Sequence, residues 1–156
     1  MTRLLGIDLG DRRIGLAIAE DGPARPLATI RRGATASDDT AAIDALVRAH
    51  AIEELVVGLP LDMAGGEGPQ AAATRAWAAA VAPALGLPMA LRDERLSSHV
   101  AETRVGPMPR GRSGGPPTAA QRERHRARVD REAAAVILQD ELDARVAGAR
   151  GEAVAR

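Results

Sequence analysis

The chain has 156 residues, with 21 basic and 21 acidic side chains, and its formal net charge is zero. This length fits one domain with a substantial core, and the balanced charge gives no global signal for nucleic-acid or membrane binding. The absence of cysteine excludes disulfides, thiolate metal sites and cysteine nucleophiles. No apolar run reaches membrane-spanning length and the first residues show no signal-peptide pattern, so we expect a cytoplasmic protein without membrane contact.

Hydrophobic patterning predicts strands that alternate with helices. Short apolar runs predict five strands, at residues 4–9, 14–20, 27–31, 54–58 and 87–91. Helical spacing and capping residues predict helices at about 38–51, 69–85 and 98–105, and a last helix that opens at Asp130. Because the first strands form a hairpin and the later ones alternate with helices, we expect an α/β domain with a five-stranded mixed sheet flanked by helices.

Two segments lack the pattern of a packed element. Residues 106–118 read GPMPRGRSGGPPT, a composition that cannot bury a core, and predict a mobile loop at about 106–120. Residues 148–156 predict a frayed C-terminal tail. We therefore expect a single domain over residues 1–147.

Acidic residues stand at positions where an unpaired carboxylate is costly. Asp8 lies inside the first strand, Asp93 and Glu94 follow the fifth, and Asp130 shares a helix face with apolar residues. If strand ends and this helix face converge, mutual repulsion favours a bound cation, and oxygen ligands favour Mg²⁺ or Mn²⁺. Such a cluster suits phosphoryl transfer. Simpler interpretations stay open: each acid could cap a turn or a helix, or lie in solvent.

Arginine supplies all the basic side chains, and several arginines lie near the acidic positions. Arg12 and Arg13 are in the turn after the first strand, and Arg95 follows the acidic pair. Four more alternate along the segment before Asp130, namely Arg122, Arg124, Arg126 and Arg128. Guanidinium groups bind phosphate in a bidentate manner, so these side chains are candidate contacts to a nucleic-acid backbone. A solvated run of charges is the alternative.

Four stretches in this order closely resemble the YqgF/RuvX family: LLGIDLGDRRIGLAIAE, VVGLPLDMAGGEGP, RDERLSS and VDREAAAVILQDELD. The likeness covers nearly all of residues 4–143, whereas the DLG motif alone is shared with sugar kinases and actin-like ATPases. The resemblance implies an RNase H-like fold. It also implies that Asp8, Glu94 and Asp130 are the catalytic and metal-binding carboxylates, with Asp93 beside them as a further ligand.

The resemblance extends to a signature loop, GLPLDMAGGEGP, near the expected site. It contains Gly58, Pro60, Gly65, Gly66 and Gly68, and the last three glycines would allow close backbone approach to a phosphate. The segment 106–118 departs from the family pattern, because it is longer and richer in Gly and Pro than is usual. This departure bears on substrate geometry more than on the metal site.

The resemblance implies a metal-dependent endonuclease acting on structured RNA, in the maturation of the 5′ end of precursor 16S rRNA, with Mg²⁺ or Mn²⁺ as cofactor. Branched DNA, as cut by a Holliday-junction resolvase, is the nearest alternative, and a non-catalytic ribosome-assembly factor is another. A kinase or ATPase fits poorly, because those proteins duplicate the fold and 156 residues leave no room for a second half. We expect a monomer or a weak homodimer.

Overall fold

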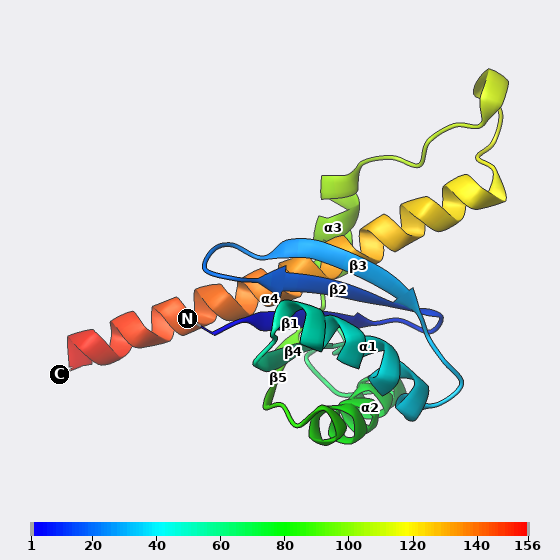
Figure 1. Cartoon of the computed structure of the whole chain (residues 1–156). Coiled ribbons are helices and arrows are strands. Elements are labelled where there is room, and N and C mark those ends of the chain that lie inside the picture. The colour runs from blue at the N-terminus through cyan, green and yellow to red at the C-terminus, as the bar shows by residue number, and fades with distance from the viewer. Residues whose placement is uncertain (1, 156) are drawn as a thin grey trace.

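The computed structural model describes residues 2–155, which form one five-stranded sheet with helices on both faces (Figure 1). The strands are β1 (Leu4–Leu9), β2 (Arg13–Ala19), β3 (Arg25–Arg31), β4 (Glu54–Leu59) and β5 (Met89–Asp93). The helices are α1 (Ala36–His50), α2 (Pro69–Leu85), α3 (Ser97–Val105) and α4 (Ala119–Ala155), with a short 3₁₀ turn at Arg112–Gly114. The predicted α/β architecture is confirmed.

The strand order is β3-β2-β1-β4-β5, so β1 lies at the centre of the sheet. β1 pairs antiparallel with β2, which pairs antiparallel with β3. On its other side β1 pairs parallel with β4, which pairs parallel with β5. Hairpins give the antiparallel half and helical crossovers give the parallel half, as the element order requires. Asp8 therefore lies between two neighbouring strands.

The helices bury two separate apolar clusters against the two faces of the sheet. On one face α1 and α2 lie together (Figure 1) and contribute Ile43, Val81 and the buried Trp77. On the other face α4 crosses the strands and contributes Ile137 and Leu138. This layered arrangement assigns each strand residue to one of two environments.

Alternation along β1 decides which environment Asp8 enters. Leu5 and Ile7 belong to the cluster under α1 and α2, so the residues of β1 that alternate with them face α4. Gly6 confirms this direction, because a Cβ added there would lie 2.8 Å from the Cβ of Leu138 on α4. Asp8 shares the face of Gly6, so its carboxylate points to the side of the sheet that α4 covers.

The last helix differs from the prediction at both ends. It begins at Ala119, so Asp130 lies well inside the helix and not in its first turn. Thr118 and Gln121 explain the earlier start: the Thr118 backbone donates to Gln121 Oε1 at 2.8 Å, and the Gln121 backbone donates to Thr118 Oγ1 at 3.1 Å. This is a capping box, whose sequence pattern T-x-x-Q was overlooked. The helix also continues to Ala155, through the segment predicted as a tail.

Smaller shifts affect the other elements. The fifth strand covers Met89–Asp93 in place of residues 87–91, because its pairing with β4 continues as far as Asp93. The third strand starts at Arg25, two residues earlier than expected. Helix α1 begins at Ala36, two residues earlier than expected, because Thr35 caps it and the Asp38 carboxylate completes the cap by accepting from the Thr35 backbone.

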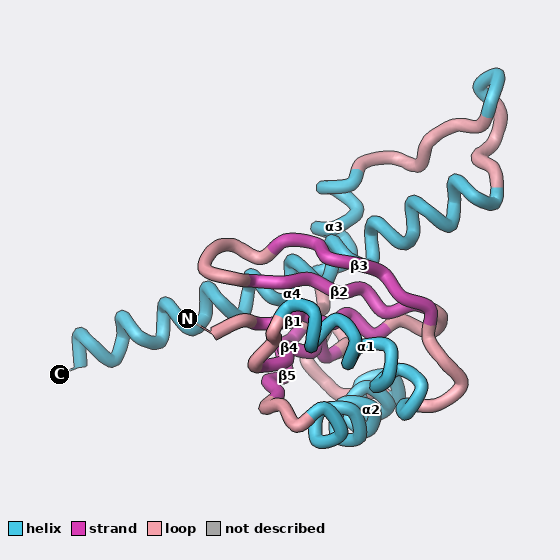
Figure 2. The backbone as a smooth tube through the Cα atoms, viewed as in Figure 1, coloured by secondary structure: helices cyan, strands magenta, loops and turns pink. Residues whose placement is uncertain are grey.

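The segment between α3 and α4 runs out beside the first turns of α4 (Figure 2). Long-range hydrogen bonds connect it to that helix, among them two at 2.9 Å: His125 Nε2 lies at this distance from the Gly106 carbonyl, and Gln121 Nε2 donates to the Arg110 carbonyl. Its mobility remains a prediction. Among the helices described for residues 2–155, none is long and apolar enough to cross a membrane.

Candidate active site

Asp8 is flanked by a glycine on each neighbouring strand. Gly15 of β2 is its direct cross-strand partner, and the register that pairs Ile7 with Val57 brings Gly58 of β4 beside it. Neither neighbour has a side chain to cover the face toward α4. The carboxylate of Asp8 therefore opens into a space that other groups of the protein can enter.

Two groups use the space that these glycines leave. A Cβ on residue 15 would lie 1.9 Å from the backbone oxygen of Asp130, so Gly15 lets α4 approach the sheet closely. A Cβ on residue 58 would lie 2.5 Å from Oε2 of Glu94, so Gly58 makes room for that carboxylate. Gly58 belongs to β4 itself, and its assignment to the signature loop was wrong. Gly58 leaves room for the Glu94 carboxylate and does not make a loop flexible.

The connection from β5 to α3 fixes the position of Glu94. Its backbone N–H donates to the Leu59 carbonyl at 3.2 Å, and its own carbonyl accepts from the Ser97 backbone at 3.0 Å and the Ser97 hydroxyl at 2.9 Å. The side chain turns inward, where Oε2 is buried without a hydrogen-bond partner among the described residues. A buried oxygen of this kind costs free energy unless a proton or a cation satisfies it.

Asp8 and Glu94 form a pair of carboxyls that act on each other's ionisation. Burial is the main cause that raises the pKa of Asp8 to about 6; the hydrogen bond with Glu94 opposes this rise, and the charge of Asp130 adds to it. Burial also raises the pKa of Glu94 to about 9, followed by the charge of Asp8. The pair therefore holds a proton near neutral pH, where ordinary carboxyls are ionised. A divalent cation would replace that proton.

Asp130 lies near this pair but is bound to an arginine. Nε of Arg13 donates to Oδ2 of Asp130 at 2.6 Å, and Nη1 of Arg13 lies 3.6 Å from Oε2 of Glu123. The Arg13 and Asp130 side chains are only 20% and 24% exposed, so water screens their attraction weakly. The predicted phosphate contact Arg13 thus serves, in this structure, as the counter-ion of the predicted metal ligand Asp130.

Asp93 is also paired with an arginine and not with the other acids. Nε of Arg95 donates to Oδ2 of Asp93 at 2.8 Å, and this hydrogen bond holds the pKa of Asp93 below its ordinary value. Nη1 of Arg95 donates to the Met63 carbonyl at 3.2 Å. Arg95 therefore joins the end of β5 to the loop after β4.

That loop is closed by one acidic side chain. Oδ1 of Asp62 accepts from the backbones of Ala64 at 2.9 Å and Gly66 at 2.8 Å. Gly65 adopts a positive φ of 86°, a conformation that glycine tolerates best. Gly68 is the N-cap of α2, directly before Pro69. The loop from Pro60 to Gly68 is thus turned back on itself beside Arg95.

The expected convergence of carboxylates is only partly present. Asp8 and Glu94 meet, while Asp130 and Asp93 are neutralised by Arg13 and Arg95. Among the side chains that the structure describes, in residues 2–151, no three acidic, histidine or cysteine groups are arranged so that they could hold a metal ion. The complete cluster expected from sequence is therefore not assembled, because two of its members have arginine partners. Their role as metal ligands stays a prediction.

The remaining predicted phosphate contacts are on the surface near Asp130. Arg12 is exposed in the β1–β2 turn, and four exposed arginines follow the first turns of α4, namely Arg122, Arg124, Arg126 and Arg128. Arg122 Nη1 donates to the Pro117 carbonyl at 2.7 Å, which connects α4 to the preceding loop. Arg12, Arg126 and Asp130 line one cavity of about 490 Å³.

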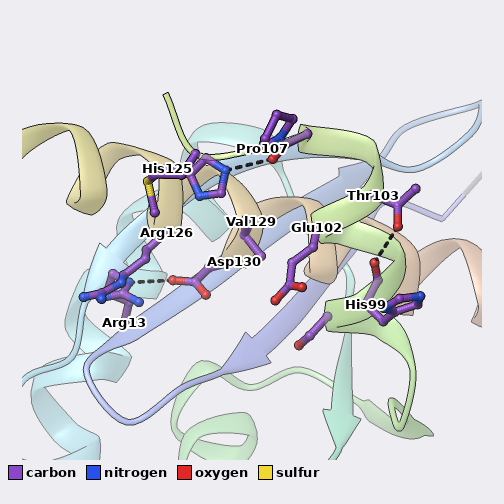
Figure 3. A pocket seen from close by; sticks show the side chains of 12 residues that line it. Arg13, His99, Glu102, Thr103, Pro107, His125, Arg126, Val129 and Asp130 are labelled. Atoms are coloured by element: carbon purple, nitrogen blue, oxygen red, sulfur yellow. Dashed lines mark hydrogen bonds and ion pairs between the residues drawn. The ribbon is translucent and has the colours of Figure 1, made fainter. Parts of the chain in front are cut away.

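A larger cavity of about 820 Å³ separates α3 from α4 (Figure 3). Asp130 and Arg126 line it from α4, and Glu102 reaches into it from α3 (Figure 3). His125 closes one end through its contact with Gly106. The hollow lies next to Asp130, so a chain bound along the site would pass between these two helices.

Sequence reasoning missed the buried carboxylate of Asp39, which connects α1 to α2 and to the turn after β1. Its Oδ1 accepts from the Gly33 backbone at 2.7 Å, and its Oδ2 accepts from Trp77 Nε1 at 2.9 Å. Arg32, 3.6 Å from Asp39, donates to the Gly10 carbonyl at 3.1 Å. The sequence does contain a signal for this role, because Asp39 lies on the same stripe of α1 as its buried apolar residues.

Comparison with known proteins places the chain in a family. The family model described as "RuvX: Holliday junction resolvase" matches residues 2–144. The chain belongs to the RuvX family. Relatives named "Putative pre-16S rRNA nuclease" include one from Anaeromyxobacter dehalogenans (strain 2CP-1 / ATCC BAA-258), which is 48% identical over 92% of this chain and 98% of its own. Another, from Moorella thermoacetica (strain ATCC 39073 / JCM 9320), is 42% identical over 90% and 94%.

Solved structures agree with the RuvX assignment at the level of the fold. Thermus thermophilus RuvC superimposes with a TM-score of 0.51 at 16% identity, covering 94% of this chain and 97% of that one. The same protein in complex with a Holliday junction substrate gives 0.52 at 18% identity, with 93% and 96% covered. The expected RNase H-like fold is confirmed.

Proposed function

We propose that this RuvX family member is a metal-dependent endonuclease that hydrolyses phosphodiester bonds of structured RNA, with the 5′ end of precursor 16S rRNA as its substrate. The observation that carries the proposal is the buried Asp8–Glu94 pair, in which Oε2 of Glu94 has no partner among the described residues. The names of the curated relatives support the choice of substrate.

The donors at this site suit Mg²⁺ or Mn²⁺. Asp8 and Glu94 offer carboxylate oxygens, and the space above Gly58 holds the Glu94 carboxylate where a side chain would block it. Asp8 and Glu94 would bind the ion, and Asp130 would join them once it leaves Arg13. A bound divalent ion would supply an activated water and stabilise the negative charge that develops on the oxygens around phosphorus.

The chain's own residues bind and orient the substrate. Exposed arginines on the first half of α4 would hold successive phosphates, and Arg12 would hold another at the β1–β2 turn. The 820 Å³ cavity between α3 and α4 would receive the strand next to Asp130. A binder that never cleaved would gain nothing from buried acids facing a polyanion, and this weighs against a purely structural assembly factor.

Branched DNA is the second candidate substrate, because the family description names a Holliday junction resolvase. A direct comparison separates the two. Purified protein is incubated with a precursor 16S transcript and with a four-way DNA junction, in Mg²⁺, Mn²⁺ or EDTA. We expect cation-dependent cleavage of the transcript, and preferential cutting of the junction would make the protein a resolvase.

Site variants decide whether the carboxyl pair performs the reaction. Asp8→Asn and Glu94→Gln keep the shape of each side chain and prevent it from ionising to bind the cation, so we expect cleavage to fall to the EDTA background. Asp11→Asn, in the exposed turn nearby, is the matched control and should cleave like the wild type. Equal cleavage by wild type and Asp8→Asn would rule out the proposed site.

A further inference from the structure

Arg13 is placed between the predicted metal site and the surface that a nucleic acid would contact. Its Nε holds Oδ2 of Asp130 at 2.6 Å, and its Nη1 lies 3.6 Å from Glu123. Glu123 and Asp130 are two helical turns apart on α4, so both project from the same side of the helix toward β2. Arg13 therefore bridges two acidic side chains of α4, one of which, Asp130, lies near the Asp8–Glu94 pair.

The backbone gives Asp130 little freedom to move away from the other acids. Gly15 brings the backbone of α4 so close that a Cβ there would lie 1.9 Å from the Asp130 oxygen. Gly15 is also the cross-strand partner of Asp8. Asp130 is therefore held beside Asp8 whether or not its charge is compensated, and only the orientation of its side chain can change. Arg13 is the group that sets this orientation.

The same guanidinium is accessible from the substrate side. Arg13 lines the cavity of about 490 Å³ that Arg12 and Arg126 share, and a second one of about 330 Å³ together with Arg31. These arginines make the neighbourhood attractive to phosphate. A guanidinium that binds a phosphate through two N–H groups has fewer donors left for carboxylates. Contact with Asp130 and contact with a phosphate therefore compete for Arg13.

We propose that Arg13 is a positioning residue that exchanges Asp130 for a phosphate of the bound nucleic acid, and that this exchange frees Asp130 to bind the divalent cation. The inference rests on the proposed function and adds that binding of the nucleic acid and binding of the cation strengthen each other. Nucleic acid raises the affinity of the site for the cation, and the cation raises the affinity for nucleic acid by the same factor. Without substrate, Arg13 keeps the third carboxylate out of the cation site.

Cation titrations of charge variants test this exchange. Mn²⁺ binding is measured by calorimetry on the wild type, Arg13→Gln, Arg13→Lys and Arg12→Gln, without nucleic acid. We expect Arg13→Gln to bind Mn²⁺ at least about fivefold more tightly than the wild type, the lower range of allosteric couplings. Arg13→Lys keeps the charge and should stay close to the wild type. Arg12→Gln removes the same charge one residue away and should change the affinity less than twofold.

The second measurement adds a short RNA hairpin, whose integrity is checked by electrophoresis after each titration. RNA should raise the cation affinity of the wild type about fivefold or more and leave that of Arg13→Gln unchanged. An affinity of Arg13→Gln equal to or weaker than the wild type would overturn the exchange, as would an equal RNA effect in both proteins. A tighter cation site cannot result from damage to the fold, so a general loss of structure would not imitate the expected result.

Asp8→Asn separates this inference from the proposed function. If Asp8→Asn loses Mn²⁺ binding while Arg13→Gln binds like the wild type, the site is correct and only the exchange is wrong. If Asp8→Asn binds Mn²⁺ as tightly as the wild type, the cation lies elsewhere and the proposed function itself fails.

Discussion

Gly58 and Glu94 are fitted to one another: a Cβ on residue 58 would lie 2.5 Å from Oε2 of Glu94, and 2.5 Å from Cδ1 of Ile137 on α4. The glycine thus makes space at once for a carboxylate of the site and for the helix above it. A methyl group at this position would have to displace one of them. Packing is the reason for a glycine here, and backbone conformation is not, since the φ angle of Gly58 lies outside the left-handed region.

We predict that Gly58→Ala destabilises the protein by about 1–3 kcal/mol, the usual cost of overpacking. It should also weaken the rise in melting temperature on Mn²⁺ addition, because the displaced Glu94 no longer binds the ion with Asp8. Urea unfolding and thermal melts with and without Mn²⁺ measure both effects. Gly22→Ala is the control: nothing lies within 4 Å of its added Cβ, so stability and cation response should be preserved.

Gly15→Ala should cost more than Gly58→Ala. The obstacle to its Cβ is the backbone oxygen of Asp130, at 1.9 Å, and a helix backbone cannot rotate away as a flexible side chain can. We expect a loss of about 3 kcal/mol or more in urea unfolding, at the upper end of overpacking costs. Equal stabilities of the two variants would mean that α4 shifts easily on the sheet, and Asp130 would then not be held beside Asp8.

The sequence predicted the carboxylates of this site better than it predicted which groups pair with them. Asp8 and Glu94 were found because a carboxylate at a strand or its end is locally recognisable, and the α/β sheet followed from alternation. The pairing of Arg13 with Asp130 joins residues 117 positions apart, so no local pattern contains it. Whether an arginine binds a phosphate or a neighbouring acid depends on the packing of α4 on β2, which the motifs do not encode.

Other misses came from signals that were present but not used. The start of α4 was encoded by Thr118 and Gln121 as a capping box, whereas the helix was predicted to open only at Asp130. The glycines inside β1, β2 and β4 were an indication that a backbone comes close to this face of the sheet. Only the structure identifies what approaches them: Leu138 at Gly6 and Asp130 at Gly15.

Replacing Asp8 should make stability less sensitive to pH. Burial raises the pKa of Asp8 in the folded protein to about 6, above the value of about 4 for an unfolded chain. The protonated form is therefore favoured by folding, and the stability it contributes below pH 4 is lost as the pH rises through 6. In EDTA, Asp8→Asn should exceed the wild type by about 1–3 kcal/mol at pH 7.5, since one pKa unit corresponds to about 1.4 kcal/mol.

Urea unfolding of both proteins at pH 4 and pH 7.5 measures this difference, which should be small at the lower pH and larger at the higher one. Asp11→Asn, at an exposed position, should stay within about 0.5 kcal/mol of the wild type at both values. A wild type more stable than Asp8→Asn at pH 7.5 would show that the Asp8 charge is compensated in the folded protein without a cation.

The exposed arginines of α4 should bind the nucleic-acid backbone without regard to sequence. Arg124 and Arg126 are exposed residues of α4, the helix that lies on the face of the sheet opposite to α1 and α2 (Figure 1). We predict that Arg124→Ala with Arg126→Ala weakens RNA binding for all sequences tested. Each lost phosphate contact should flatten the log–log salt dependence by up to about one unit. Binding titrations at several salt concentrations, performed on an Asp8→Asn background to prevent cleavage, measure both quantities.

The matched control removes the same charge at a distance from the site. Arg48 on α1 and Arg25 at the start of β3 are exposed, and β3 starts at the end of the sheet away from Asp8, so Arg48→Ala with Arg25→Ala lowers the net charge equally. We expect this control to keep the salt slope of the parent protein, because surface charges beyond about 8 Å are largely screened at physiological ionic strength. If the two double variants lose equal affinity, net charge alone accounts for the binding. If neither loses any, the arginines of α4 form a solvated run and the RNA lies on another surface.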